Sequence, residues 1–294
     1  MLGFLIWLVR WEEEDRVKIK YFVIQRVGAI IIFSGVIMFN IVGAIGVLSE
    51  LGLILKLGLA PFHSWFINLV LIIKKNSLFI LITLQKVLPL YFLIIIREFK
   101  QMFPFFILCV VLGTIGGLSQ LCWKKIIGYS SVFTGSWFML NFSSLSRLFI
   151  FFIVYSIRVF VVVSLLFLSE KTNQFYIQVN FSKRDLIILI LGFLSIAGVP
   201  PLLGFFGKTI LLIIGREIIS ELVLALILIT SIVFTYIYVR LIYRNLSRSS
   251  IRALYKAQFY SSGVWWVVLL LGGLIIFFLC VGVTTLSFDL KENN

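Results

Sequence analysis

Long apolar runs, separated by short polar segments, recur along almost the whole chain. A run of about 20 residues is long enough for a helix to cross the hydrocarbon core of a bilayer. The runs are continuous rather than alternating, so they predict helices and not the strands of a membrane barrel. We predict an all-α polytopic membrane protein with spans at residues 19–40, 43–60, 77–96, 104–122, 124–142, 147–168, 186–212, 219–243 and 262–287.

Two segments interrupt the helical pattern within apolar sequence. They are KLGLAP at residues 56–61 and GVPPLLGFFGK at residues 198–208. Proline removes a hydrogen-bond donor and clashes with the preceding turn, so a helix breaks there. A broken helix in each half of a membrane protein is typical of inverted-repeat transporters. Residues 64–75 are too short to span and are expected to be interfacial or re-entrant.

The N-terminal run, MLGFLIWLV, ends at Arg10 and is too short to span a bilayer. It does not resemble a signal peptide, because no basic segment precedes it and no small-residue cleavage site follows it. We therefore expect a partial helix that a separate chain continues.

Composition and charge exclude several classes of protein. Hydrophobic residues make up 61% of the chain and charged residues 13%, about half the charged fraction of a soluble domain. The net charge of +14 comes from 26 lysines and arginines scattered at the ends of the spans, where they reach lipid headgroups, so we predict no nucleic-acid partner. A single histidine and three cysteines without paired spacing indicate neither a metal or haem site nor a disulfide framework: Cys109, Cys122 and Cys280.

Ionisable side chains within the predicted spans are the candidates for function, because each costs about 2.5–3.5 kcal/mol near the bilayer centre. Lys86 is the clearest, since it lies in the middle of LFILITLQKVLPLYFLIII, and Lys56 and Lys208 lie beside the two breaks. Burial disfavours the charged form of a lysine. A row of such lysines linked by water can therefore exchange protons, which arginine does not readily do.

The other ionisable residues also have a structural interpretation. Lys20, Glu50 and Arg158 fit a structural or a functional role equally well, and Arg26 is expected to snorkel. His63 follows the first break. It is either a hydrogen-bonded interfacial residue or a proton relay.

Four motifs, in this order, resemble the antiporter-like proton-channel subunits of respiratory complex I. They are IKYF at 19–22, KLGLAPFHSW at 56–65, GLSQLCWKKIIGYSS at 117–131 and LSIAGVPPLLGFFGK at 194–208. The order and spacing agree from about residue 20 to residue 243, and the last span agrees only in hydropathy. Within this family, the GVPPLLGF form resembles the subunit 2 type.

The resemblance implies an inverted-repeat antiporter-like fold of two five-helix repeats, each with a broken helix. It identifies Lys56 and Lys208 as the lysines of the two broken helices, and Lys86 as the central lysine that joins the half-channels. His63 matches the histidine after the first break, and Lys20 matches an additional lysine of bacterial members.

The family pairs the counterpart of Lys56 with a glutamate that would fall upstream of Met1 in this alignment. Glu50 is a weaker candidate partner, because six helical residues place the two side chains about 120° apart. We expect one transmembrane domain over 1–294. Residues 1–142 hold the remainder of the first repeat and the following helix, 143–260 the second repeat, and 261–294 a C-terminal helix and tail.

These features predict a proton-translocating membrane-arm subunit of NADH:ubiquinone oxidoreductase, with multiple spans in the mitochondrial inner membrane. The chain lacks a Rossmann glycine fingerprint and an Fe–S cysteine set, so NADH, FMN, Fe–S clusters and ubiquinone are expected on other subunits. Expected partners are subunits of the 4 and 4L types, the separate N-terminal chain, and lipids including cardiolipin. Two alternatives stay open: a subunit of a multi-subunit Na⁺/H⁺ antiporter, and a non-conducting scaffold.

Overall fold

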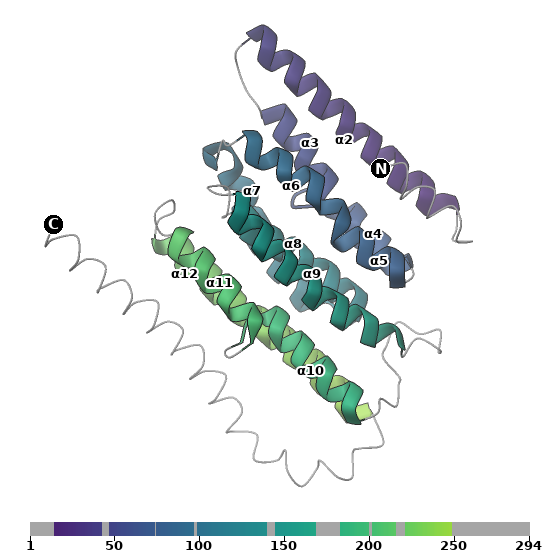
Figure 1. Cartoon of the computed structure of the whole chain (residues 1–294). Coiled ribbons are helices and arrows are strands. Elements are labelled where there is room, and N and C mark those ends of the chain that lie inside the picture. Colours follow the sequence, from purple (N-terminus) through teal and green to yellow (C-terminus); the bar gives the residue numbers. More distant parts are fainter. Residues whose placement is uncertain are drawn as a thin grey trace, which may run out of the picture.

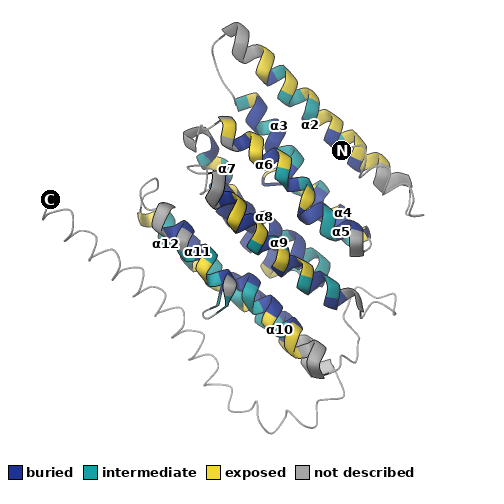
Figure 2. Ribbon diagram, viewed as in Figure 1, coloured by how far each residue is buried: buried dark blue, intermediate teal, exposed yellow. Residues whose placement is uncertain are grey.

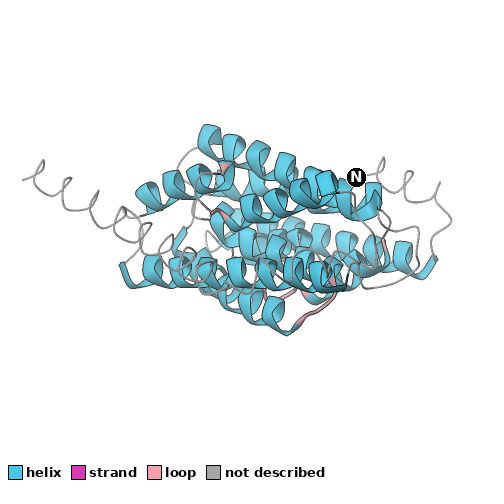
Figure 3. Ribbon diagram, turned by 90° about the horizontal axis from the view of Figure 1, so that it is seen from below, coloured by secondary structure: helices cyan, strands magenta, loops and turns pink. Residues whose placement is uncertain are grey.

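The computed structural model describes residues 15–42, 47–73, 75–96, 99–139, 145–168, 183–199, 202–215 and 221–248. Every regular element in these ranges is an α-helix (Figure 3), which confirms the predicted all-α class. The predicted N-terminal partial helix and the predicted span 262–287 lie outside the described residues.

Four described helices contain an apolar stretch long enough to cross a membrane: α2 (Asp15–Val42), α7 (Phe99–Ser119), α9 (Leu145–Leu168) and α12 (Glu221–Arg248). The others are shorter: α3 (Val47–Leu57), α4 (Ser64–Ile72), α5 (Lys75–Ile82), α6 (Leu84–Ile96), α8 (Trp123–Met139), α10 (Lys183–Ala197) and α11 (Leu203–Gly215).

The helices lie side by side, from α2 at one edge to α10, α11 and α12 towards the other (Figure 1). Helix α8 is central, since it packs against α4, α7 and α12. Helix α2 exposes one long apolar face (Figure 2), whereas α8 is buried at every residue from 130 to 139. The position of α8 makes it the element that both broken helices approach.

Small residues let neighbours approach α8 closely. A Cβ at Gly135 would lie 2.2 Å from Cδ2 of Leu59, so the first break packs directly on this helix. Close packing of small residues is how helices associate in lipid, where the hydrophobic effect does not drive them together. Cys109 of α7 is buried and Cys122 is half-buried, and Cys280 lies outside the described residues.

The first predicted break is present between α3 and α4. Gly58 has a φ of 65°, a left-handed conformation that glycine adopts without steric cost. Its N–H donates to the carbonyl of Leu55, and the N–H of Leu59 donates to that of Ile54. This hydrogen-bond pair is the Schellman motif that terminates helices. Pro61 then prevents the helix from resuming at once. Within the predicted span 43–60 the structure describes helix α3 from Val47 to Leu57, and residues 43–46 lie outside the described residues.

The second break repeats this geometry between α10 and α11. Gly198 has a φ of 83°. Its N–H donates to the carbonyls of Leu194 and Ser195, and the N–H of Val199 also donates to Leu194. Pro200 and Pro201 themselves lie outside the described residues. The predicted span 186–212 is therefore two helices, with α11 beginning at Leu203.

A third interruption was not predicted. The expected span 77–96 divides into α5 and α6 at Thr83, three residues before Lys86. The hydroxyl of Thr83 donates to the carbonyl of Phe79, and its own carbonyl accepts a tight-turn bond from the N–H of Lys86. Pro89, inside α6, cannot donate to the preceding turn, which favours this local tightening.

Residues 64–72 form helix α4, which packs against α8 and buries Phe66, Ile67, Leu69 and Val70. This arrangement fits the re-entrant alternative of the sequence prediction. The α3–α4 pair is the first broken helix, and α10–α11 is the second.

Candidate functional site

Lys86 is buried, as predicted, and it lies beside the first broken helix, which the sequence did not predict. Only 3% of it is exposed. Its Nζ donates to the carbonyl of Ser131 on α8 at 3.0 Å and lies 5.2 Å from the ring centroid of Phe66 on α4. The ammonium therefore rests on a backbone carbonyl and an aromatic face, both of which stabilise a cation.

Lys208 occupies a similar environment beside the second broken helix. It is 7% exposed, and its Nζ donates to the carbonyl of Ala197, the last residue of α10. Its Nζ also lies 5.9 Å from the ring centroid of Phe133 and 5.5 Å from that of Trp137, both on α8. Both buried lysines thus contact α8.

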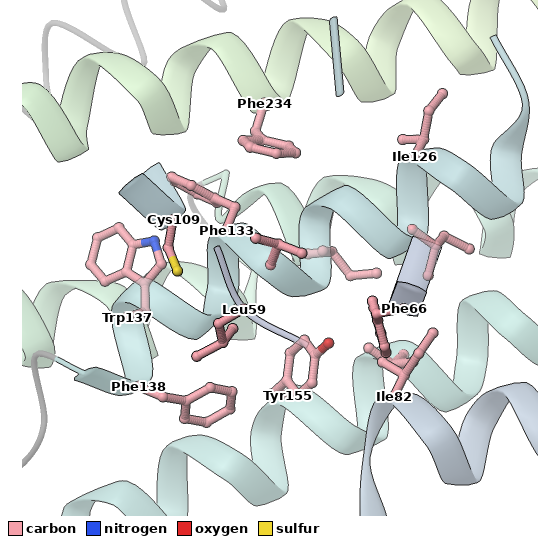
Figure 4. Packing of buried hydrophobic residues seen from close by; sticks show 14 of the residues in the cluster. Leu59, Phe66, Ile82, Cys109, Ile126, Phe133, Trp137, Phe138, Tyr155 and Phe234 are labelled. Carbon is pink, nitrogen blue, oxygen red and sulfur yellow. The ribbon is translucent and has the colours of Figure 1, made fainter. Parts of the chain in front are cut away.

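Phe133 also stacks on Phe234 of α12, with ring centroids 4.4 Å apart (Figure 4). This stack fills the space between α8 and α12 with apolar atoms.

Hydroxyl groups on α8 connect the surroundings of the two lysines. The carbonyl of Ser131, which accepts from Lys86, also accepts from the hydroxyl of Thr134 at 3.1 Å. The hydroxyl of Thr134 is hydrogen-bonded to that of Tyr155 on α9, and Tyr155 interacts electrostatically with Arg158. Arg158 in turn interacts electrostatically with Lys208. Hydrogen bonds therefore join Lys86 to Tyr155 through α8, and charge interactions extend from Tyr155 through Arg158 to Lys208; we call this series of groups the polar path.

The polar groups of this path are not evident from the sequence. Thr134 and Tyr155 were not singled out, and neither was Tyr238, which is hydrogen-bonded to Ser130. The available signal was the density of serine and threonine in α8, at positions 130, 131, 134 and 136. Most such hydroxyls in helices bond only to their own backbone, so the signal does not identify cross-helix partners.

Lys56 lies in the last turn of α3 and is half-buried. Its side chain packs over Gly28 of α2, where an added Cβ would lie 2.8 Å from its Cγ. The side chain of Gln25 on α2 donates to the carbonyl of Lys56 at 3.4 Å. Lys56 therefore faces α2, away from the contacts that join Lys86 to Lys208.

Glu50 is fully buried in the first turn of α3. Among the side chains that the structure describes, it is the only buried carboxylate. Its role as a partner of Lys56 stays a prediction.

His63 and Lys20 are more accessible than the buried lysines. His63 lies at the end of the first break, half-buried, with Nδ1 3.2 Å from the carbonyl oxygen of Pro61 and its ring centroid 5.9 Å from that of Tyr129. Lys20 is exposed near the start of α2. The structure brings His63 to α8 but leaves Lys20 apart from the buried path.

Comparison with known proteins agrees with this architecture. The family described as NADH:quinone oxidoreductase/Mrp antiporter, TM, matches residues 2–235. The NADH-ubiquinone oxidoreductase chain 2 of Artemia franciscana is 29% identical over 77% of this chain and 74% of that protein. The same protein of Metachirus nudicaudatus is 34% identical over 77% of this chain and 70% of its own length.

A solved structure shares the fold. A chain of respiratory complex I from Thermus thermophilus superposes with a TM-score of 0.66 at 22% identity, over 80% of this chain. This chain spans 60% of the length of that one. The inverted-repeat antiporter-like fold is thereby confirmed. From the match over residues 2–235 and the chain 2 relatives, the protein belongs to the NADH:quinone oxidoreductase/Mrp antiporter transmembrane family.

Proposed function

We propose that this chain is a proton-translocating subunit of the membrane arm of NADH:ubiquinone oxidoreductase, in the mitochondrial inner membrane. The observation that carries the proposal is the pair of buried lysines, Lys86 and Lys208, each held on a backbone carbonyl beside a broken helix. The names of the chain 2 relatives supply the enzyme and the compartment.

A carbonyl partner suits a lysine that must exchange a proton. A carboxylate would hold the ammonium charged through ion pairing. A carbonyl oxygen accepts from the ammonium and from the neutral amine alike, because both carry N–H groups. Each lysine can thus change charge without losing its position in the fold.

The remaining predicted residues lie outside this path, near the first break or on α2 and α3. We assign Lys56 and His63 to proton delivery near the first break, with Lys20 and Glu50 as further candidates on α2 and α3. NADH, FMN, Fe–S clusters and ubiquinone belong in this proposal to other subunits. Subunits of the 4 and 4L types and cardiolipin are the proposed neighbours in the membrane.

The enzyme context is tested by purification in mild detergent. We expect the chain to co-purify with flavin and Fe–S subunits, and the complex in vesicles to take up protons when NADH is oxidised. Sodium–proton exchange by a purified complex without redox subunits would instead support the multi-subunit antiporter, whose family shares this fold.

Replacing Lys208 with methionine tests the proton path at the second break. We expect a clear loss of NADH-driven proton uptake in vesicles, because methionine fills a similar volume but carries no proton. The matched control is Thr209→Val at the next residue of α11, whose hydroxyl donates to the carbonyl of Phe206 in the same helix. Equal proton uptake by Lys208→Met and Thr209→Val complexes would favour the non-conducting scaffold.

A further inference from the structure

Arg158 is a buried cation in the middle of α9, with 6% of its surface exposed. Its Nε donates to the carbonyl of Val154 in its own helix at 3.0 Å. Its Nη1 donates across to the carbonyl of Ser195 on α10, also at 3.0 Å. Ser195 lies in the last turn of α10, next to the second break. Arg158 therefore joins α9 to the broken end of α10.

The same end of α10 receives Lys208. The carbonyls of the last helical turn lack partners within the helix and carry the negative end of the helix dipole. Arg158 takes the carbonyl of Ser195, and Lys208 takes that of Ala197, two residues further along. The two cations share one half-helix end and interact electrostatically. A guanidinium keeps its proton under all ordinary conditions, whereas an ammonium can release one.

Gly204 of α11 lies directly against the hydrogen bond between Arg158 and Ser195. A Cβ at Gly204 would lie 1.7 Å from the carbonyl oxygen of Ser195 and 2.5 Å from Nη1 of Arg158. The backbone of α11 thus covers the hydrogen bond between Arg158 and Ser195. Because water is kept out, the charge of Arg158 acts on its neighbours at a low effective dielectric constant.

At the first break, a neutral side chain makes the contact that corresponds to that of Arg158. There the side chain of Gln25 on α2 donates to the carbonyl of Lys56, in the last turn of α3. In each half, the long helix that precedes the broken helix supplies the donor. The neutral amide at the first break shows that holding the helix end does not require a cation. The positive charge of Arg158 therefore needs an explanation other than binding the carbonyl at the end of α10.

We propose that Arg158 is a positioning residue for proton transfer at Lys208. The permanent positive charge of Arg158 lies at the same end of α10 as the ammonium of Lys208 and favours release of a proton from that ammonium. The proton leaves Nζ of Lys208, which becomes a neutral amine, and Arg158 keeps all of its protons. Among the described residues, the guanidinium then remains as the only cation on the carbonyls at the end of α10. This inference rests on the proposed proton-translocating function.

Other titratable groups around the two cations are few in the described part of the chain. Tyr155 of α9 and Tyr238 of α12 interact with Arg158. The described side chains of α5, at 77–82, and of α10, at 187–197, include no titratable group. Helix α8 presents the rings of Phe133 and Trp137 to Lys208. None of these residues carries a carboxylate that would neutralise the charge of Arg158.

The test is the pH profile of NADH-driven proton uptake by the assembled complex in vesicles. Arg158→Gln keeps hydrogen-bond donors and removes the charge, so the high-pH limit of uptake should move upward by about one unit, the effect of a neighbouring charge. The matched control is Arg240→Gln, because Arg240 of α12 also donates to a helix-end carbonyl, that of Gln120, at 2.8 Å. Its profile should match that of the unaltered complex.

Arg158→Lys extends the test should the glutamine variant fail to assemble. Its amine keeps the charge at low pH and can lose it at high pH. We expect its profile to match the unaltered one at low pH and to diverge at high pH. A lower uptake at every pH with an unmoved limit, in either variant, would mean a purely structural role and overturn the proposal. An effect of Lys208→Met without any shift in the Arg158 variants would reject this inference alone and leave the proposed function standing.

Discussion

Lys86→Met is expected to remove most of the proton transfer that passes through this chain. Lys86 donates from an ammonium group to the carbonyl of Ser131, where the polar path begins on α8, and the other donor to that carbonyl is the hydroxyl of Thr134. Loss of a positioned proton-transfer group typically slows its step by about 10²–10⁴-fold. The measurement is proton uptake per NADH oxidised, with the complex reconstituted in sealed vesicles.

The fold should tolerate this change. Methionine is flexible, and its sulfur packs well against an aromatic ring such as that of Phe66. The carbonyl of Ser131 also keeps its hydrogen bond from Thr134. The control is Lys124→Met, since Nζ of Lys124 donates to the carbonyl of Ile73 at 3.4 Å near the start of α8. If both variants pumped like the unaltered complex, the central role of Lys86 would be wrong.

Gly204→Ala is expected to give the largest loss of assembled complex. Its Cβ would lie 1.7 Å from the carbonyl oxygen of Ser195 and 2.9 Å from the carbonyl carbon, which are backbone atoms that cannot rotate away. Overpacking a core costs about 1–3 kcal/mol and sometimes more. Here α11 must move off α10, which also disturbs the hydrogen bond from Arg158 to Ser195. The amount of intact complex in native gels and its thermal inactivation temperature are the measurements.

Gly207→Ala, three residues later on the same helix, is the matched control. Its Cβ would meet only the ring of Phe151, at 3.1 Å and 3.3 Å, and a small shift of that side chain relieves the contact. Helix α11 also gains from alanine, a better helix former than glycine. We expect normal assembly for this variant. Normal assembly of Gly204→Ala as well would contradict the close packing of α10 and α11.

The positions of both broken helices could be read from the sequence because each depends on local chemistry. Glycine followed within three residues by proline favours the end of a helix, and Gly58 and Gly198 both end helices in the same way. The interruption at Thr83 could not be read so easily. Threonine and the later Pro89 are both tolerated within membrane helices, where neighbouring groups satisfy the freed backbone.

Only part of the candidate site could be predicted from the sequence. The burial of Lys86 followed from its place in a long apolar run, since such a lysine cannot reach either surface. Its acceptor, Ser131, is 45 residues away in sequence. From the sequence, Arg158 fitted a structural or a functional role equally well, because Ser195 and Lys208 are not among its sequence neighbours. The roles of Lys56, His63, Lys20 and Glu50 stay predictions.

The sequence by itself determined the helical class, the two glycine–proline breaks and which charges lie within apolar spans. These follow from hydrophobicity and backbone chemistry over a few neighbouring residues. Only the tertiary structure decided that α8 lies at the centre, that both buried lysines contact it, and that Arg158 and Lys208 share the end of α10. A helix that is apolar on all sides has no distinct apolar face, so its sequence does not show which helices it packs against. Their order is set by close packing between distant residues, as at Gly135 and Gly204, which hydropathy does not encode.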